Sequence, residues 1–199
     1  DIVDGSPLPG GGPMNAAIAC ARLGVPAAFG GALSTDEYGE MLYAHIDVNG
    51  VALDLIQRTD APTARAVVEH IPELQFTFEG DSTADMQLSE FDVAAVGPGP
   101  HILHGGTLGM FRGQTAETLA ALAEQHDGVV SLDPNIRPQI LDNDPVLRAE
   151  WTGFHDRWLS NTDIYKGSDE DLAWIFPDLD PAEWVETLLA AGVSTVIIT

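Results

Sequence analysis

The sequence predicts an α/β fold in which a mostly parallel, doubly wound sheet is flanked by helices and carries a small inserted β-sheet. Two observations lead to this prediction. After residue 85 short apolar strands alternate with helical patterns, as in successive βαβ units. Between about residues 51 and 80 the chain changes to short strands in which side-chain character alternates. The length of 199 residues, 45% of them hydrophobic, suits a single such domain over residues 1–199.

The first part of the chain reads as a helix, a strand and a second helix. Residues 13–23 are helical, because Pro13 suits the first position of a helix and Gly24 suits its end. A strand is expected over residues 25–33. The apolar spacing of residues 36–48 predicts the second helix, which closes at Asn49.

The inserted sheet is expected to contain three antiparallel strands, at residues 51–56, 64–71 and 75–78. After residue 85 the βαβ alternation begins. Its expected strands are 93–96, 101–104, 128–133, 163–165 and 194–198, and its expected helices are 114–125, 145–159, 168–175 and 181–191. The last strand is apolar and reads as an inner strand of a covered sheet. We therefore expect the fold to continue beyond Thr199 and to begin before Asp1.

The charge balance excludes several kinds of partner. Asp and Glu number 31 against eight Lys and Arg, so the formal net charge is −23. Such a chain repels nucleic-acid phosphates and anionic lipid, and no apolar run is long enough to cross a membrane. The first residues lack the features of a secretory signal, and a lone Cys20 suits a reducing compartment. These features together predict a cytoplasmic protein.

Three segments could carry chemistry, and the first is the glycine-rich stretch that precedes the first helix. Gly11 and Gly12 would let a ligand approach backbone N–H groups at the helix N-terminus. Asn15, in the first turn, offers both a donor and an acceptor, which suits the hydroxyls of a sugar. The alternative is a flexible turn with a structural role only, with Pro13 at the first helical position.

The second segment follows the apolar strand 128–133. Asp133, Asn135 and Arg137 come where Pro134 ends strand pairing, so these side chains should lie at the carboxyl edge of the sheet, where doubly wound folds bind ligands. Arg137 could hold a phosphate or a developing negative charge. The alternative is a surface turn in which Asp133 pairs locally with Arg137.

The third segment is Lys166 to Leu172. Ser168 and Asp171 have the spacing of a helix capping box, which is a sufficient structural explanation. The functional alternative is a carboxylate that holds a hydrated magnesium ion near a phosphate chain.

Taken together and in this order, these segments resemble the ribokinase-like (PfkB) carbohydrate kinases, most closely the fructokinase and 2-keto-3-deoxygluconate kinase branch. The stretches that carry the resemblance are Gly11-Gly12-Pro13-Met14-Asn15, Ala21-Arg22-Leu23-Gly24, Ser34-Thr35-Asp36-Glu37-Tyr38-Gly39, Ala61-Pro62-Thr63-Ala64, Thr83-Ala84-Asp85, Asp133-Pro134-Asn135-Ile136-Arg137-Pro138 and Ser168-Asp169-Glu170-Asp171-Leu172.

The resemblance implies transfer of the γ-phosphoryl group of ATP, with Mg²⁺, to a sugar hydroxyl, under a β-sheet lid that commonly also forms a homodimer interface. The positions implied for the sugar are Asp1, Gly11, Gly12, Asn15, Asp133 and Asn135. Arg137 would face the substrate as a catalytic residue. Lys166, Ser168 and Asp171 would lie near the magnesium and the triphosphate.

Several positions depart from the family pattern. Ser34 replaces a glycine, and Ser168 with Asp171 replaces an Asn and a Glu. Glu79 and Gly80 stand where a Tyr and an Arg often hold an acidic sugar, which favours a neutral sugar such as fructose. The family's Gly-Ala-x-Gly-Asp segment, with its catalytic base, is not among residues 1–199. We therefore expect the 199-residue chain by itself to be inactive. The alternatives are a catalytically inactive sugar-binding or regulatory homologue and a nucleoside kinase of the same fold.

Overall fold

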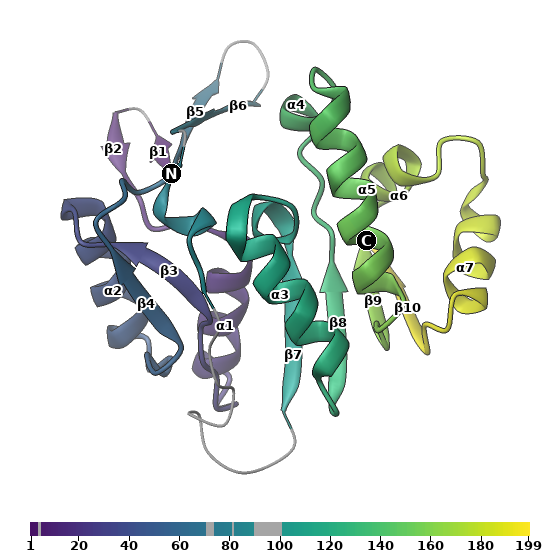
Figure 1. Ribbon diagram of the computed structural model, residues 1–199, viewed down its shortest axis with the longest axis horizontal. Coiled ribbons are helices and arrows are strands. Elements are labelled where there is room, and N and C mark those ends of the chain that lie inside the picture. The colour runs from purple at the N-terminus through teal and green to yellow at the C-terminus, as the bar shows by residue number, and fades with distance from the viewer. Residues whose placement is uncertain (4, 71–73, 81, 90–100) are drawn as a thin grey trace. The chain divides into compact units, whose positions relative to one another are not determined.

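The structure is a computed structural model, and it describes residues 1–199 except 4, 71–73, 81 and 90–100 (Figure 1). The chain divides into two compact units. The first contains Asp1–Pro98 and Gly113–Thr115, and the second contains Gly99–Arg112 and Ala116–Thr199. Each unit is described by itself below. In the described part of the chain, no helix combines the length and the apolar character needed to span a bilayer.

Two helices and two parallel strands form the core of the first unit. They are α1 (Gly12–Arg22), β3 (Gly31–Ser34), α2 (Glu37–Val48) and β4 (Ile56–Thr59). β3 and β4 pair in parallel from Gly31 opposite Ile56 to Ser34 opposite Thr59. The helices bury one apolar stripe each against these strands, and the buried residues of this core are Met14, Ile18, Leu33, Ile46 and Val51.

The inserted sheet has the order β2-β1-β5-β6. Its strands are β1 (Ile2–Val3), β2 (Ser6–Pro7), β5 (Arg65–His70) and β6 (Leu74–Glu79). β5 and β6 pair antiparallel, as the alternation in this part of the sequence predicts. β1 pairs antiparallel with β2 but parallel with β5, so the sheet is mixed.

Three strand predictions need comment. The strand expected at 51–56 is wrong: the chain turns there, the Ile56 N–H donates to the Leu53 carbonyl, and the strand that begins at Ile56 pairs with β3 rather than with the inserted sheet. The strand expected at 25–33 is shortened to Gly31–Ser34, and only an isolated bridge joins Ala28 to Ala52. The strand expected at 93–96 lies outside the described residues.

The start of α2 explains the sequence pattern of residues 34–39. The Asp36 carboxylate caps the helix by accepting from the Gly39 N–H at 2.8 Å, and it also accepts from the Thr63 N–H at 2.8 Å and the Thr63 hydroxyl at 2.6 Å. A Cβ on Gly39 would lie 1.9 Å from the Ser34 carbonyl oxygen, so only glycine fits there. Desolvation alone would raise the pKa of Asp36, but the hydrogen bonds from Thr63, Gly39 and Ser34 lower that pKa to about 2. Asp36 therefore ties α2 to the loop before β5.

Replacing the Asp36 cap should destabilise the first unit. We expect Asp36→Ala to reduce the free energy of unfolding by about 1–3 kcal/mol, because a helix cap and two further hydrogen bonds are lost. The pKa of Asp36 is lower in the folded state, so its stabilisation is present above about pH 4 and is lost as the pH falls toward 2. Hydrogen exchange of the α2 amides measures the effect, and the exposed Glu37→Gln is the control. Equal exchange rates in the two variants would contradict the prediction.

The second unit is a run of βαβ units around a parallel sheet of order β10-β9-β8-β7. Its strands are β7 (Ile102–Gly106), β8 (Val129–Asp133), β9 (Ile164–Gly167) and β10 (Thr195–Ile198). Its helices are α3 (Gly113–Gln125), α4 (Pro138–Leu141), α5 (Pro145–Leu159), α6 (Asp169–Ile175) and α7 (Pro181–Ala190). These elements confirm, from Ile102 onward, the alternation expected after residue 85.

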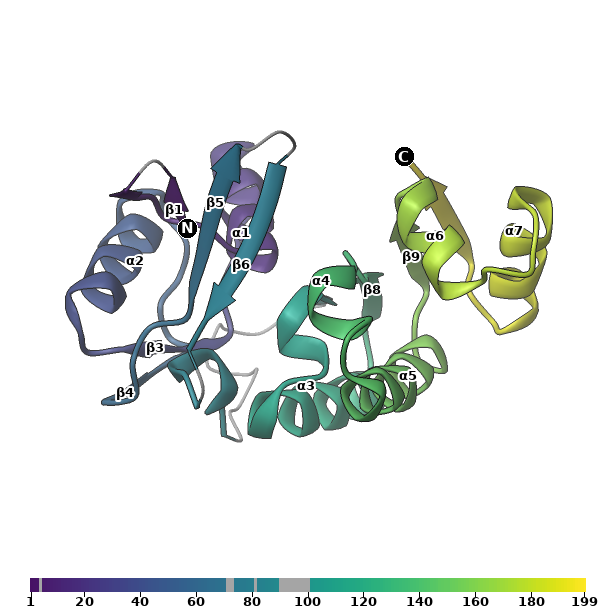
Figure 2. The same cartoon turned by 90° about the horizontal axis from the view of Figure 1, so that it is seen from above.

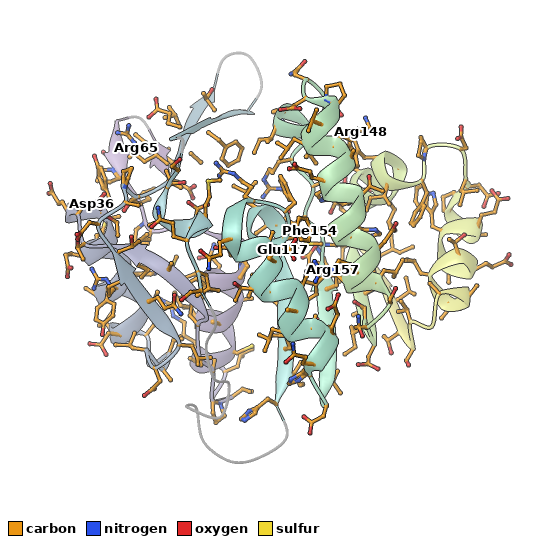
Figure 3. All side chains as sticks on the ribbon, viewed as in Figure 1. Asp36, Arg65, Glu117, Arg148, Phe154 and Arg157 are labelled. Carbon is orange, nitrogen blue, oxygen red and sulfur yellow. The ribbon has the colours of Figure 1, made fainter. Side chains whose placement is uncertain are left out.

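Helices α3 and α5 lie side by side along this sheet (Figures 1 and 2). Arg157 on α5 joins them: its guanidinium contacts Glu117 and Glu124 of α3, each at 2.7 Å, and lies over the Phe154 ring (Figure 3). Beneath the helices Val130, Leu132 and Tyr165 point from the sheet into a core that is closed by Trp158. This packing sets the face of the sheet that is left for polar side chains.

His155 is buried in the same core. Its ring stacks on Trp151 with centroids 4.8 Å apart, and its Nε2 lies 2.9 Å from the Tyr165 hydroxyl. Desolvation lowers the pKa of His155 to about 4, although Asp156 opposes the change. The histidine is therefore neutral in the folded protein at neutral pH.

This neutral histidine predicts a pH dependence of stability. Between pH 6.5 and about 4 the unfolded chain binds a proton at His155 while the folded chain does not, so the free energy of unfolding falls as the pH falls. The loss amounts to about 3 kcal/mol and is complete below pH 4. All four tryptophans belong to the second unit, so their fluorescence in urea titrations reports its stability. In His155→Gln the free energy of unfolding should depend less on pH, whereas His45→Gln on α2 should show the wild-type dependence. An unchanged pH dependence in His155→Gln would contradict the attribution to His155.

Candidate functional site

A row of polar side chains crosses one face of the sheet in the second unit. His104 on β7 pairs in register with Ser131 on β8, and Gly106 pairs with Asp133 at the end of β8. Residues two apart on a strand share a face, so His104, Ser131 and Asp133 lie on the face opposite Leu132 and the helix-covered core. Lys166 on β9 joins them, since its Nζ lies 3.1 Å from Asp133 Oδ2. The row runs to the carboxyl ends of these parallel strands, as the sequence predicts for Asp133.

The side chains of this row interact with one another through hydrogen bonds and charge. His104 Nδ1 lies 3.1 Å from the Ser131 hydroxyl. Desolvation lowers the pKa of His104; the charge of Asp133 opposes this effect and that of Lys166 adds to it. The other oxygen of the carboxylate, Asp133 Oδ1, is buried and has no hydrogen-bond partner in the described part of the chain. A buried carboxylate oxygen without a partner is costly, so the contact of Lys166 with the other oxygen matters for this carboxylate.

The turn after β8 is held by residues from two other elements. The Thr107 N–H donates to the Pro134 carbonyl at 3.1 Å, and the Ile136 N–H donates to Asp171 Oδ1 at 2.7 Å. These contacts connect the turn to the 3-10 helix Thr107–Met110, which follows β7, and to the start of α6. The backbone is strained at two positions here. Thr107 has φ 57° and Asn135 has φ 43°, both in the left-handed region that residues other than glycine rarely adopt. Strain of this kind persists only where the surrounding structure enforces it, and it is common at binding sites.

Arg137 stabilises the turn with one arm of its guanidinium. Its Nη1 donates to the Asn135 carbonyl at 3.0 Å, to Asn135 Oδ1 at 2.8 Å and to the Ile136 carbonyl at 2.8 Å. Nη2 and Nε make no hydrogen bond within the described residues, so three N–H groups are available to a ligand. Desolvation lowers the pKa of Arg137, and the charges of Asp171 and Asp133 oppose this change. The local ion pair of Asp133 with Arg137, considered from the sequence, does not form, since Asp133 pairs with Lys166 instead.

Ser168 and Asp171 form the capping box that their spacing predicts. The Ser168 hydroxyl accepts from the Asp171 N–H at 3.1 Å, and Asp171 Oδ2 accepts from the Ser168 N–H at 3.2 Å. Because Oδ1 accepts from Ile136, both carboxylate oxygens of Asp171 are engaged, and the residue is only 8% exposed. Asp171 therefore does not fit a direct magnesium ligand. Nowhere in the described residues do three His, Cys, Asp or Glu side chains gather as a metal site.

The glycine-rich stretch belongs to the first unit, together with Asp1. A Cβ on Gly10 would lie 2.0 Å from Asp1 Oδ2, so the absence of a side chain lets this carboxylate lie against the stretch. Gly11 is the N-cap of α1 with φ 134° and provides no side-chain cap. Asn15 is exposed in the first turn of α1, where its backbone N–H donates to the Gly11 carbonyl, and its side-chain amide makes no hydrogen bond within the described residues. Its amide side chain is thus available to a ligand.

The structure brings the predicted site residues together within each unit. Asp133, Asn135 and Arg137 lie with Lys166, Ser168 and Asp171 around one turn of the second unit, while Asp1, Gly11, Gly12 and Asn15 lie together in the first. The sequence reasoning missed His104, Gly106 and Thr107. Two adjacent glycines that end a strand, followed by a polar residue, are the signal that could have found them. A Cβ on Gly106 would lie 1.8 Å from the Asp133 carbonyl oxygen, so this position requires glycine.

The comparison with known protein families agrees with this arrangement. The model of the pfkB family carbohydrate kinases matches residues 5–199. The chain belongs to this family. A fructokinase of Rhizobium leguminosarum bv. trifolii is 31% identical over 197 residues, which are 98% of this chain and 59% of that protein. A fructokinase of Klebsiella pneumoniae is 31% identical over 198 residues, which are 96% of this chain and 62% of that protein.

Solved structures share the ribokinase-like fold. The crystal structure of a Xylella fastidiosa fructokinase with bound ATP superposes with a TM-score of 0.80 at 28% identity, over 98% of this chain and 63% of that one. A putative ribokinase II of E. coli superposes with a TM-score of 0.78 at 23% identity, over 98% of this chain and 63% of that one, a level that bears on the fold alone. The chain thus spans about 60% of the length of these relatives.

Proposed function

We propose that this protein is a sugar kinase, which transfers the γ-phosphoryl group of ATP to a hydroxyl of a neutral sugar such as fructose. The observation that carries the proposal is the turn after β8. It presents unbonded donors of Arg137 beside the Asp133–Lys166 pair at the carboxyl edge of a parallel sheet. Relatives with the name fructokinase, at 31% identity, support the same reaction. We also propose that the two units belong to one domain, since a single family model runs through both.

In this proposal the first unit offers polar groups for the hydroxyls of the sugar. The Asn15 amide and the Asp1 carboxylate take hydroxyl groups, with the backbone of Gly11 and Gly12 close by. In the second unit, Asp133 and Asn135 are proposed as sugar-binding residues. Arg137 uses its remaining N–H groups to stabilise the negative charge that builds up during phosphoryl transfer. A neutral sugar is favoured because Glu79 is an acid and pairs with Arg65 across β5 and β6, at 2.9 Å.

The nucleotide would approach the segment from Lys166 to Asp171. Mg²⁺ would accompany ATP and neutralise charge on its phosphates. Because Asp171 is buried and each of its oxygens already accepts a hydrogen bond, we place the ion on the phosphates and water rather than on this carboxylate. The role left for Ser168 and Asp171 is to order the start of α6. We also place the protein in the cytoplasm, on the grounds of its single cysteine.

The sheet β2-β1-β5-β6 is proposed as the lid and as a homodimer interface. Its two outer strands each pair with one neighbour within the described residues, so each leaves backbone groups that a second copy could use. Sedimentation of the complete gene product tests this: a dimer that dissociates when β6 is interrupted by proline supports the interface, and a monomer at all concentrations contradicts it.

The reaction is tested by ADP release from Mg-ATP by the complete gene product. Fructose, 2-keto-3-deoxygluconate, ribose and adenosine are compared with a blank that lacks substrate. Turnover with fructose is the expected result, and turnover with adenosine would favour the nucleoside kinase instead. Sugar binding without any turnover would favour the inactive homologue. The 199-residue chain assayed by itself should show no sugar-dependent turnover, since the segment with the family's base is not among its residues.

A further inference from the structure

Lys166 is the only lysine of a chain with 31 acidic residues, and its contact in the structure is unexpected. The sequence groups it with the nucleotide segment. In the fold its Nζ instead lies 3.1 Å from Asp133 Oδ2, on the neighbouring strand, and both side chains are mostly enclosed, at 35% and 23% exposure. Within the described residues this is the one ion pair of Asp133, whose other oxygen is buried and unbonded. The carboxylate therefore depends on Lys166 for its orientation.

We propose that Lys166 is a positioning residue of the sugar site: it fixes the Asp133 carboxylate and, through it, the turn that carries Asn135 and Arg137. The inference rests on the sugar-kinase function proposed above and adds to it a residue with a distinct role. Lys166 acts from β9, Thr107 from the 3-10 helix after β7 and Asp171 from α6, so three different elements hold one turn. The latter two anchor backbone groups at Pro134 and Ile136, whereas Lys166 alone anchors a side chain predicted to contact the sugar.

Geometry on the β7 side makes the lysine necessary. Gly106, the register partner of Asp133, has no side chain that could support the carboxylate, and no side chain would fit there. The next residue of β7 on this face, His104, is bonded to Ser131. Among the described residues, the support for the Asp133 carboxylate comes from Lys166 on β9. Lysine suits this role because its ammonium has three donors, of which one suffices for the carboxylate.

The test separates a positioning role from a nucleotide-binding role by steady-state kinetics of the complete gene product. Lys166→Met should raise the KM for the sugar about tenfold or more while the KM for ATP changes less than about twofold. Without Lys166 the Asp133 carboxylate is no longer held in the position in which it binds the sugar. Lys166→Arg should restore most of the sugar KM. Arg22→Met is the matched control: it removes one positive charge from α1, where the Arg22 side chain bonds among the described residues to Asn49 alone, and it should change neither constant. A raised KM for ATP with an unchanged KM for the sugar would overturn the inference, as would a failure of Lys166→Arg to rescue.

A second measurement does not require activity. Hydrogen exchange of the 134–137 turn should be about tenfold faster in Lys166→Met than in the wild type, with α3 unchanged. If no sugar is phosphorylated by the wild type, the proposed function fails, and the exchange data still decide the positioning role. If Lys166→Met does not fold, the double variant Lys166→Met with Asp133→Asn removes both charges; its sugar KM should equal that of Asp133→Asn with Lys166 intact. A further increase in the double variant would contradict the pairing.

Discussion

Arg137→Ala should reduce kcat/KM for the sugar by about 100-fold or more, because a preorganised charge facing the reacting group is lost. A second effect adds to the first. Nη1 holds the left-handed Asn135 and the Ile136 carbonyl, so the alanine variant also releases the turn. We expect kcat to fall more than the sugar KM rises, since the charge matters most in the transition state.

Two variants control this prediction. Arg137→Lys keeps the charge but has a single nitrogen, which cannot keep three bonds to the turn and also donate to a ligand, so it should recover only part of the activity. Arg22→Ala, on α1, should be as active as the wild type. If Arg137→Ala retained more than about a third of wild-type kcat/KM, the residue would have no role in transfer.

Trp158→Ala should destabilise the second unit by about 3–5 kcal/mol, the usual cost of removing a large ring from a core. Trp158 is fully buried, and it fills the space that Gly105 leaves: a Cβ on Gly105 would lie 2.2 Å from Trp158 Cη2. Since a domain is stable by only about 5–15 kcal/mol, the variant should be largely unfolded at low urea. Fluorescence of the remaining tryptophans, all in this unit, measures the transition.

Trp158→Phe separates the volume of this ring from its polar atom. The Trp158 Nε1 is buried without a hydrogen-bond partner among the described residues, so phenylalanine removes an unsatisfied donor while it keeps most of the packing. It should therefore cost much less than alanine. Leu189→Ala, at a position 48% exposed on α7, should be within about 1 kcal/mol of the wild type. A similarly small effect of Trp158→Ala would show that the core does not depend on this ring.

The elements found correctly from the sequence are those that local interactions determine. Ser168 and Asp171 form their capping box within three residues, and the helix they start has nearly the expected bounds. The strand before Asp133 is recognised because an apolar run ends at a proline. The same local reading placed Arg137 at the carboxyl edge of the sheet, where the structure has it.

Pairings between distant segments were decided only by the tertiary structure. The alternation of residues 51–56 gave no sign that the strand starts at Ile56 and pairs with β3, nor that β1 joins the inserted sheet.

The sequence by itself thus determined the succession of strands and helices, the helix ends and the segments that carry polar groups, because these depend on residues within a few positions of one another. Only the tertiary structure decided that Lys166 pairs with Asp133 and that Asp171 accepts a hydrogen bond from the Ile136 N–H. Those contacts join residues more than 30 positions apart in sequence, and they follow from strand order and register, which the pattern along one strand does not encode.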